Sequence, residues 1–188
     1  MPIDSVINVA ITEIFKGSPP PDSSKISLYK KLQIPIFYRN INRDLNCLGG
    51  SFSSTFMKVS FNYYLLSDRF TFDNNKLFTH DDTTYFNIQL SNCISGHINK
   101  NSYKGLPFTS NEEIERFRKI TSADNMNKLT FDFINLYIPL FNRNKDIALV
   151  AIEHIALNSS GYGEGDYLIL KKDQGNWQVI KDVLWWAK

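Results

Sequence analysis

The stretch Ile147-Ala-Leu-Val-Ala-Ile-Glu-His-Ile-Ala-Leu157 decides the fold of this chain. Its odd-numbered and even-numbered positions, which face opposite sides of a strand, are apolar apart from Glu153 and His154. A strand with two apolar faces lies inside a sheet that is covered on both sides. The sequence therefore predicts a central strand over 147–157, with a helix over one of its faces.

Two more strands follow the central one. Residues 166–172 and 177–186 are rich in strand-forming residues, and the polar run 173–176 between them is typical of a hairpin turn. The glycine-rich segment 158–165 predicts a wide hairpin loop, in which several glycines take positive φ.

The residues before the central strand extend the same pattern. The stretch 131–141 is rich in residues that favour strands, and 142–146 is a polar turn. Together these elements predict an antiparallel meander over 131–186. Weaker patterns predict an edge strand at 34–38 and a short strand at 85–90.

Two helices are predicted outside the meander. Residues 1–17 place apolar side chains at helical spacing, with Asp4 as the N-cap. The Pro/Ser-rich segment 18–24 is predicted to be a stiff connector. A second helix is predicted from Ser110, because Glu113 stands three residues on, as in a capping box. These elements predict an α+β fold, with a curved antiparallel sheet packed by two or more helices.

The composition limits the class of protein. The length of 188 residues predicts a single domain over 1–188. Hydrophobic residues make up 43% and aromatic residues 14%, which excludes a mainly disordered chain. The formal net charge of +2 provides no broad basic field, so we expect no nucleic-acid partner. No apolar run reaches about 18 residues, so we expect no membrane insertion.

The cysteines and the N-terminus do not decide the cellular compartment of the protein. Cys47 and Cys93 form no C-x-x-C pair, and they fit either one disulfide or two half-buried thiols. We favour two thiols, since free cysteine is commonly buried. The start Met1-Pro2-Ile3-Asp4 is unlike a signal peptide. The chain is therefore cytoplasmic or follows a removed leader, with a slight preference for a periplasmic or other extracytoplasmic location.

The end of the chain resembles a C-terminal signature of a loosely defined group of small bacterial proteins. The resemblance rests on the run LFNRNKDIALV at 140–150 and the run GYGEGDYLILKKDQGNWQVI at 161–180, closing on Trp185. Ala187 stands where the group usually has Ser. The resemblance implies no catalytic residues. At the level of fold alone, the pattern is also similar to the curved sheets of NTF2-like proteins and to bacterial immunity proteins.

A partner-binding surface is predicted around the glycine-rich loop and the end of the chain. The loop fails as a dinucleotide motif, because Asp166 stands where a glycine is needed and a strand follows. We instead expect Tyr162, Glu164 and Asp166 to project from the loop as contact residues. Of the adjacent Trp185 and Trp186, one is expected in the core and the other outward, or both in the core.

Few residue patterns in this chain carry catalytic chemistry. Glu153 and His154 are adjacent in a strand and point to opposite faces, so they form no acid–base pair with each other. Either one could be a general base with a shifted pKa, or a polar residue whose hydrogen-bonding groups all have partners. His80-Asp81-Asp82 is a cluster of metal-ligating types, and an exposed polar loop is the favoured interpretation. We expect no catalytic residue, no metal and no cofactor.

The leading hypothesis is a non-enzymatic protein-binding module, of the immunity type that neutralises a partner toxin by occluding it. Aromatic anchors among acidic groups would complement a basic surface on the protein partner. The alternative is an NTF2-like pocket protein that binds or acts on a small hydrophobic ligand, with Glu153 or His154 as its acid–base residue. A third hypothesis is a passive extracytoplasmic domain of a larger envelope system.

Overall fold

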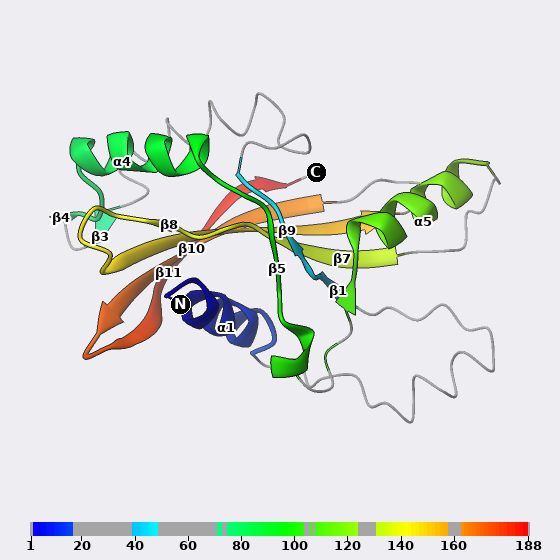
Figure 1. Cartoon of the computed structure of the whole chain (residues 1–188), viewed down its shortest axis with the longest axis horizontal. Helices are drawn as coiled ribbons and strands as arrows, with labels where there is room; N and C mark the ends of the chain where they lie inside the picture. Colours follow the sequence, from blue (N-terminus) through cyan, green and yellow to red (C-terminus); the bar gives the residue numbers. More distant parts are fainter. Residues whose placement is uncertain are drawn as a thin grey trace.

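The computed structural model describes residues 2–16, 39–48, 71–72, 75–103, 106, 108–123, 131–157 and 163–187. In this part of the chain, a seven-stranded mixed sheet has helices on both of its faces (Figure 1). The elements are, in chain order, α1 (Pro2–Ile14), β1 (Arg39–Asn42), β2 (Asp44–Leu45), β3 (Thr71–Phe72), β4 (Asn75–Lys76), α4 (His80–Ser91), β5 (Gly96–His97), the 3₁₀ helix η2 (Lys100–Ser102), β6 (Phe108–Thr109), α5 (Asn111–Ala123), β7 (Phe131–Leu136), β8 (Leu140–Phe141), β9 (Ile147–Leu157), β10 (Gly163–Asp173) and β11 (Asn176–Ala187).

The sheet runs in the order β11-β10-β9-β7-β1-β6, and the short β8 also pairs with β9. Strands β7, β9, β10 and β11 form the antiparallel meander predicted for 131–186. β1 is parallel to both of its neighbours, β6 and β7. The fold is therefore α+β as predicted, and the meander is extended on one side by two parallel pairings.

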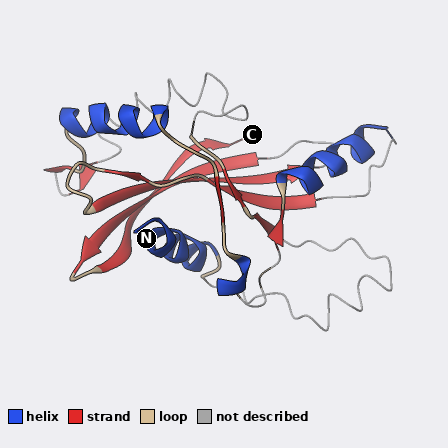
Figure 2. Cartoon of the chain, viewed as in Figure 1, coloured by secondary structure: helices blue, strands red, loops and turns tan. Residues whose placement is uncertain are grey.

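β9 is the central strand that the stretch 147–157 predicts. It pairs with β10 on one side and with β7 and β8 on the other. α1 packs on one face of the sheet, and α4 and α5 lie over the other (Figure 2). Val150 and Ile152 belong to the hydrophobic cluster on the α1 face, and Leu149 and Ala151 to the cluster on the α4 face. This double burial explains why the strand is almost wholly apolar.

The β10–β11 hairpin closes through a two-residue turn. Gln174 and Gly175 have φ values of 47° and 90°. Positive φ at both central residues is the pattern of a type I′ turn, which suits twisted strands. Among the described glycines, only Gly175 has a positive φ. The predicted wide loop is therefore wrong for Gly163 and Gly165, which are buried within β10.

α5 begins as its sequence predicts. The Glu113 amide donates to Ser110 Oγ at 3.3 Å, and Glu113 Oε2 accepts from the Ser110 amide at 3.0 Å, which completes a capping box. α1 also forms, but it begins at Pro2, a residue suited to the first helical position. Asp4 therefore lies in the first turn of α1 and is not the N-cap.

Residues 85–90 belong to α4, so the prediction of a strand there is wrong. The helix signal lay just upstream: the Asp82 amide donates to Thr79 Oγ1 at 3.2 Å, and Asp82 Oδ2 accepts from the Thr79 amide at 2.8 Å. The predicted strand at 131–141 divides into β7 and β8. The division falls just before β8, at Pro139, which has no amide hydrogen for a ladder.

α4 is fastened to the sheet along its length. At its start, the Arg143 amide donates to Asp82 Oδ1 at 2.9 Å. Near its end, Gln89 Nε2 donates to the Phe141 carbonyl at 2.7 Å, and Gln89 Oε1 accepts from the Phe141 amide at 2.9 Å. Just beyond the helix, Cys93 forms a disulfide with Cys47, their Cα atoms 5.8 Å apart. The expectation of two free thiols is therefore wrong.

Some predictions fall on parts of the chain that the structure does not describe. The connector at 18–24 and the edge strand at 34–38 lie outside the described residues. Among the helices that are described, none has the length and apolar character needed to cross a membrane.

Candidate functional site

Three carboxylates gather where β10 and β11 pair, and we call Glu164, Asp166 and Asp182 the acidic cluster. Glu164 and Asp166 are two residues apart in β10, so they share a face of the sheet. Asp182 of β11 pairs with Leu168, which follows on the same face. Glu164 and Asp166 are half-buried, and Asp182 is exposed. The pairing of β10 with β11, which has a register shift between Gly165 and Asp166, thus brings three like charges to one face.

Within the acidic cluster, Asp166 has a pKa that burial and the two neighbouring carboxylates raise. Burial, reinforced by the charges of Asp182 and Glu164, raises the pKa of Asp166 to about 6. Burial also raises the pKa of Asp182, with the Val183 amide opposing and the charge of Glu13 on α1 adding to the shift. Within the described residues, no basic side chain forms an ion pair with Asp166. The described residues therefore compensate its ionised form poorly.

The structure brings Glu164 and Asp166 together, but not as the sequence predicted. They lie within β10 and do not project from a loop. Trp185 and Trp186 belong to β11, of which the structure describes the backbone at these positions, and Trp186 pairs with Gly165. The backbone of Trp186 is therefore opposite the residue that separates the two carboxylates. Tyr162 lies outside the described residues.

Glu153 and His154 occupy opposite faces of β9, as adjacent strand residues must. His154 is half-buried and pairs across the sheet with Glu164 and with Ile134, which belongs to the α1-face cluster. Glu153 is only 7% exposed and lies on the other face, opposite Gly165 and Asn135. The two candidate acid–base residues therefore belong to different environments.

Glu153 is held in a buried hydrogen-bond network. Its Oε2 accepts from the Tyr137 hydroxyl at 2.6 Å and from Asn135 Nδ2 at 3.3 Å, and Asn135 Oδ1 accepts from Asn42 Nδ2 at 2.9 Å. Burial raises the pKa of Glu153, although the bonds from Tyr137 and Asn135 and the charge of Arg118 oppose the shift. Burial and the Glu153 charge raise the pKa of Tyr137, so its hydroxyl stays protonated and donates.

The network continues to the surface through the start of α5. Asn42 Nδ2 also donates to Asn111 Oδ1 at 2.7 Å, and the Asn111 amide donates to Asp44 Oδ2 at 2.7 Å. Asp44 Oδ1 lies 2.9 Å from Nδ1 of the exposed His97. Such a network fixes the relative positions of β1, β7, β9 and α5. The sequence singled out Glu153 as a polar residue in an apolar strand, but not the partners that hold it.

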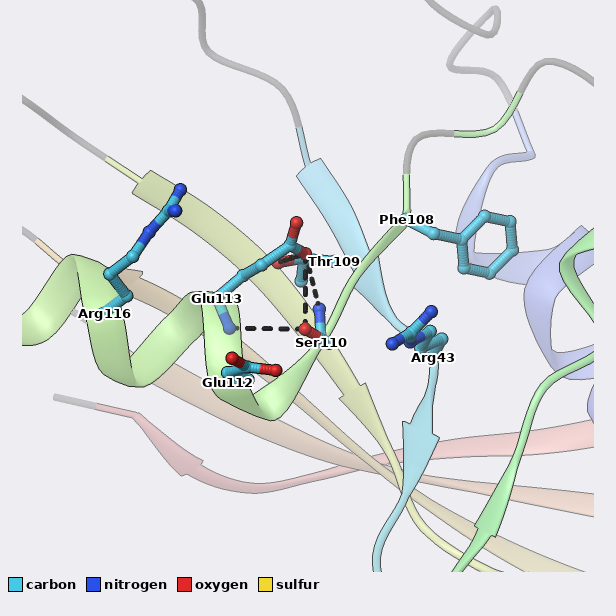
Figure 3. Close-up of a pocket in the computed structure, with 7 residues that line it drawn as sticks. All are labelled: Arg43, Phe108, Thr109, Ser110, Glu112, Glu113 and Arg116. Carbon is cyan, nitrogen blue, oxygen red and sulfur yellow. Dashed lines mark hydrogen bonds between the residues drawn. The ribbon is translucent and has the colours of Figure 1, made fainter.

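A cavity of about 380 Å³ lies beside the first turns of α5 (Figure 3). It is lined by Arg43, Phe108, Thr109, Ser110, Glu112, Glu113 and Arg116. Glu113 Oε2 also accepts from Thr109 Oγ1 at 3.1 Å, so the capping bonds of α5 order part of the wall. Glu153 and His154 do not line this cavity, so it is not the pocket that the sequence associated with them.

His80-Asp81-Asp82 begins α4 and does not form the exposed loop that was expected. Asp82 is buried, and both of its carboxylate oxygens accept hydrogen bonds, from Thr79 and Arg143. Burial raises the pKa of Asp82, but the amides of Arg143 and Thr79 outweigh it and leave the pKa below its usual value. Across the described ranges, no group of three His, Cys, Asp or Glu side chains could hold a metal ion.

Comparisons with protein-family models, with curated proteins and with solved structures find no match for this chain. Its function is therefore inferred from its own residues.

Proposed function

We propose that the chain is a non-enzymatic protein-binding module that recognises a basic surface on a protein partner through the acidic cluster. The observation that carries this proposal is the crowding of Glu164, Asp166 and Asp182 on one face, where strand pairing fixes them. Like charges held close together lower the stability of the folded chain. A cationic partner surface would compensate the charge of Asp166, which gives the cluster a reason to persist at a cost in stability.

The finer form of the proposal is an immunity-type protein, whose partner is a toxin that it occludes. Carboxylates on paired strands lose little freedom on binding, and complementary charge speeds the encounter with a basic surface. Trp185 and Trp186 stand on β11, beside the acidic cluster along the backbone, and Tyr162 directly precedes β10 in sequence. We assign these three residues as aromatic anchors, because aromatic side chains commonly dominate interface energetics.

The test compares two matched triple variants of the full chain. One is E164Q/D166N/D182N, which removes the charge of the acidic cluster and keeps the size of its side chains. The other is D81N/E115Q/D173N, which removes the same number and type of charges elsewhere. Each tagged protein is immobilised and exposed to lysate of its own source at physiological salt. We expect the parent and the control to retain one partner at equal stoichiometry, and the cluster variant to retain at least about tenfold less.

Two outcomes would contradict the proposal: retention by the cluster variant equal to that of the parent, or no partner on any column. The immunity form is tested by expressing the captured partner alone and together with the chain. We expect the partner alone to arrest growth, the parent chain to restore it, and the cluster variant to fail. If the partner alone does not impair growth, the immunity form is overturned, and the proposal of a protein-binding module is unaffected.

A second candidate function is the NTF2-like pocket protein, with Glu153 as its acid–base residue. One observation favours it: Glu153 is buried, and burial raises its pKa. It ranks second because the described cavity is lined by other residues. A thermal-shift screen of small hydrophobic ligands against the chain and its E153Q and H154Q variants tests it, with ligand-dependent stabilisation expected for the parent only.

A further inference from the structure

The cavity beside α5 is lined by three charged groups whose contacts with other described residues are long or absent. Arg43 approaches Asp44 only at 3.8 Å, and both Asp44 oxygens already have closer partners in His97 and the Asn111 amide. Within the described part of the chain, the side chains of Arg116 and Glu112 form no hydrogen bond and no ion pair. By contrast, Oε2 of Glu113 accepts the capping bonds.

The positions of these groups separate the two positive charges. Arg43 comes from the connection between β1 and β2, whereas Arg116 is on α5, and Figure 3 shows them at the two sides of the cavity, with Glu112 between them in the view. Glu112 and Arg116 are four residues apart on one helix face, a spacing that allows an ion pair, yet no such pair forms. The cavity therefore offers two separated guanidinium groups and one carboxylate.

We propose that this cavity binds a small amino dicarboxylate, a molecule with two carboxylates and one ammonium group. Arg43 and Arg116 each receive one carboxylate, for which the guanidinium fork is well suited. Glu112 receives the ammonium. The volume of about 380 Å³ falls within the roughly 300–1,000 Å³ of small-molecule sites.

This site is separate from the acidic cluster. The cavity lies by β1 and β6, at one edge of the sheet, and the acidic cluster lies on β10 and β11, at the other. The N-terminal amides of α5 take no part in the proposal, because the carboxylates of Asp44 and Glu113 already accept from them and from the cap. Failure of one site therefore leaves the other untouched.

Isothermal titration calorimetry with L-glutamate on the full chain tests the proposal. For a ligand of about ten non-hydrogen atoms at an exposed site, we expect a Kd of about 1 mM. Glutarate and N-acetyl-glutamate lack the ammonium, and glutamine lacks the second carboxylate, so each should bind about tenfold more weakly. Tight binding of N-acetyl-glutamate, which imitates the acidic C-terminus of a peptide, would overturn the assignment of the ammonium to Glu112.

Variants locate the site. R43Q and R116Q should each weaken glutamate binding about tenfold, and E112Q should abolish the preference for glutamate over glutarate. R143Q is the matched control, because Arg143 is an exposed arginine with one long contact to Asp81 and does not line the cavity. The substituted side chains are exposed, so all four variants should fold. No saturable heat with glutamate up to about ten times that Kd, or equal losses in R143Q and R43Q, would overturn the proposal.

Discussion

Asp166 binds a proton more tightly in the folded chain than in the unfolded one. Burial, Asp182 and Glu164 raise its pKa from 3.8 to about 6. Between these two pH values the folded state carries more protons at this site than the unfolded state. The site's contribution to the free energy of unfolding therefore falls as the pH rises through that window, and the loss is complete above it.

Replacement of Asp166 should therefore stabilise the chain at neutral pH. We expect D166N to raise the free energy of unfolding at pH 7 by about 1 kcal/mol, a figure reduced for the partial exposure of the side chain. At pH 3.5 the gain should vanish, because both states are then largely protonated at this site. Urea unfolding at the two pH values measures the difference, with D173N as a control in the exposed hairpin turn. An equal gain at both pH values would disprove the electrostatic origin.

Glu153 is a residue whose shape and acceptor oxygens matter more than its charge. E153A would leave the Tyr137 hydroxyl and Asn135 amide group buried without their acceptor, at a cost of about 3 kcal/mol. E153Q keeps an acceptor oxygen in place, so its free energy of unfolding at pH 7 should lie within about 1 kcal/mol of the parent. Urea unfolding at pH 7 distinguishes the two. Similar losses in both variants would mean that the ionised carboxylate itself is required.

At the scale of elements, α4 depends on tertiary contacts for its position. Its apolar residues do not form one clear stripe: Phe86 is buried on the sheet, whereas Ile88 is 53% exposed. The two hydrogen bonds between the Gln89 side chain and the Phe141 backbone, and the nearby disulfide, therefore do much to position α4.

Removal of the disulfide should loosen this helix. The bond links residues 46 apart in sequence, so C47S/C93S is expected to lower the free energy of unfolding by about 2–4 kcal/mol. Hydrogen exchange should accelerate in α4 more than in β9, because β9 is paired on both sides. Reduction of the parent chain should reproduce the shift. An unchanged urea midpoint would show that the bond does not constrain the unfolded chain.

The elements that the sequence predicted well carry local signals. β9 follows the predicted bounds because burial on both faces imposes an unbroken apolar run, and α5 starts where Ser110 and Glu113 form their cap. The prediction of a strand at 85–90 was wrong because the apolar residues Phe86, Ile88 and Leu90 alternate with other residues, as they would in a strand. Their alternation reflects an exposed Ile88 on a helix, and the Thr79 cap was the better signal.

The candidate sites were less predictable, because their partners are far apart in sequence. Glu153 could be singled out as a polar residue in an apolar strand. Its contact with Tyr137, and the link from Asn135 to Asn42, depend on how β1, β7 and β9 pair. The cavity is equally non-local, since Arg43 and Arg116 come from separate elements. The order in which the strands pair determines which residues meet at each of the two sites, and no local sequence pattern encodes that order.

At the scale of the whole molecule, the sheet separates the two candidate sites. The β10–β11 side carries the acidic cluster, and the β1–β6 side carries the two arginines of the cavity. The central strands between them are buried on both faces. The two sites share no residue, and β9 and β7 lie between them in the sheet order, so substitutions at one site should add to substitutions at the other.

The position of α1 has a consequence for synthesis on the ribosome. α1 is synthesised before the strands that it packs against, and the first of them, β9, begins about 130 residues later. At 5–20 residues per second, the apolar stripe of α1 waits roughly 7 to 27 s for its partners. An isolated helix of 13 residues is marginal in water, so α1 must remain largely unformed during that time. The nascent chain is thus a natural client for chaperones that shield short apolar segments, and slower translation would lengthen its dependence on them.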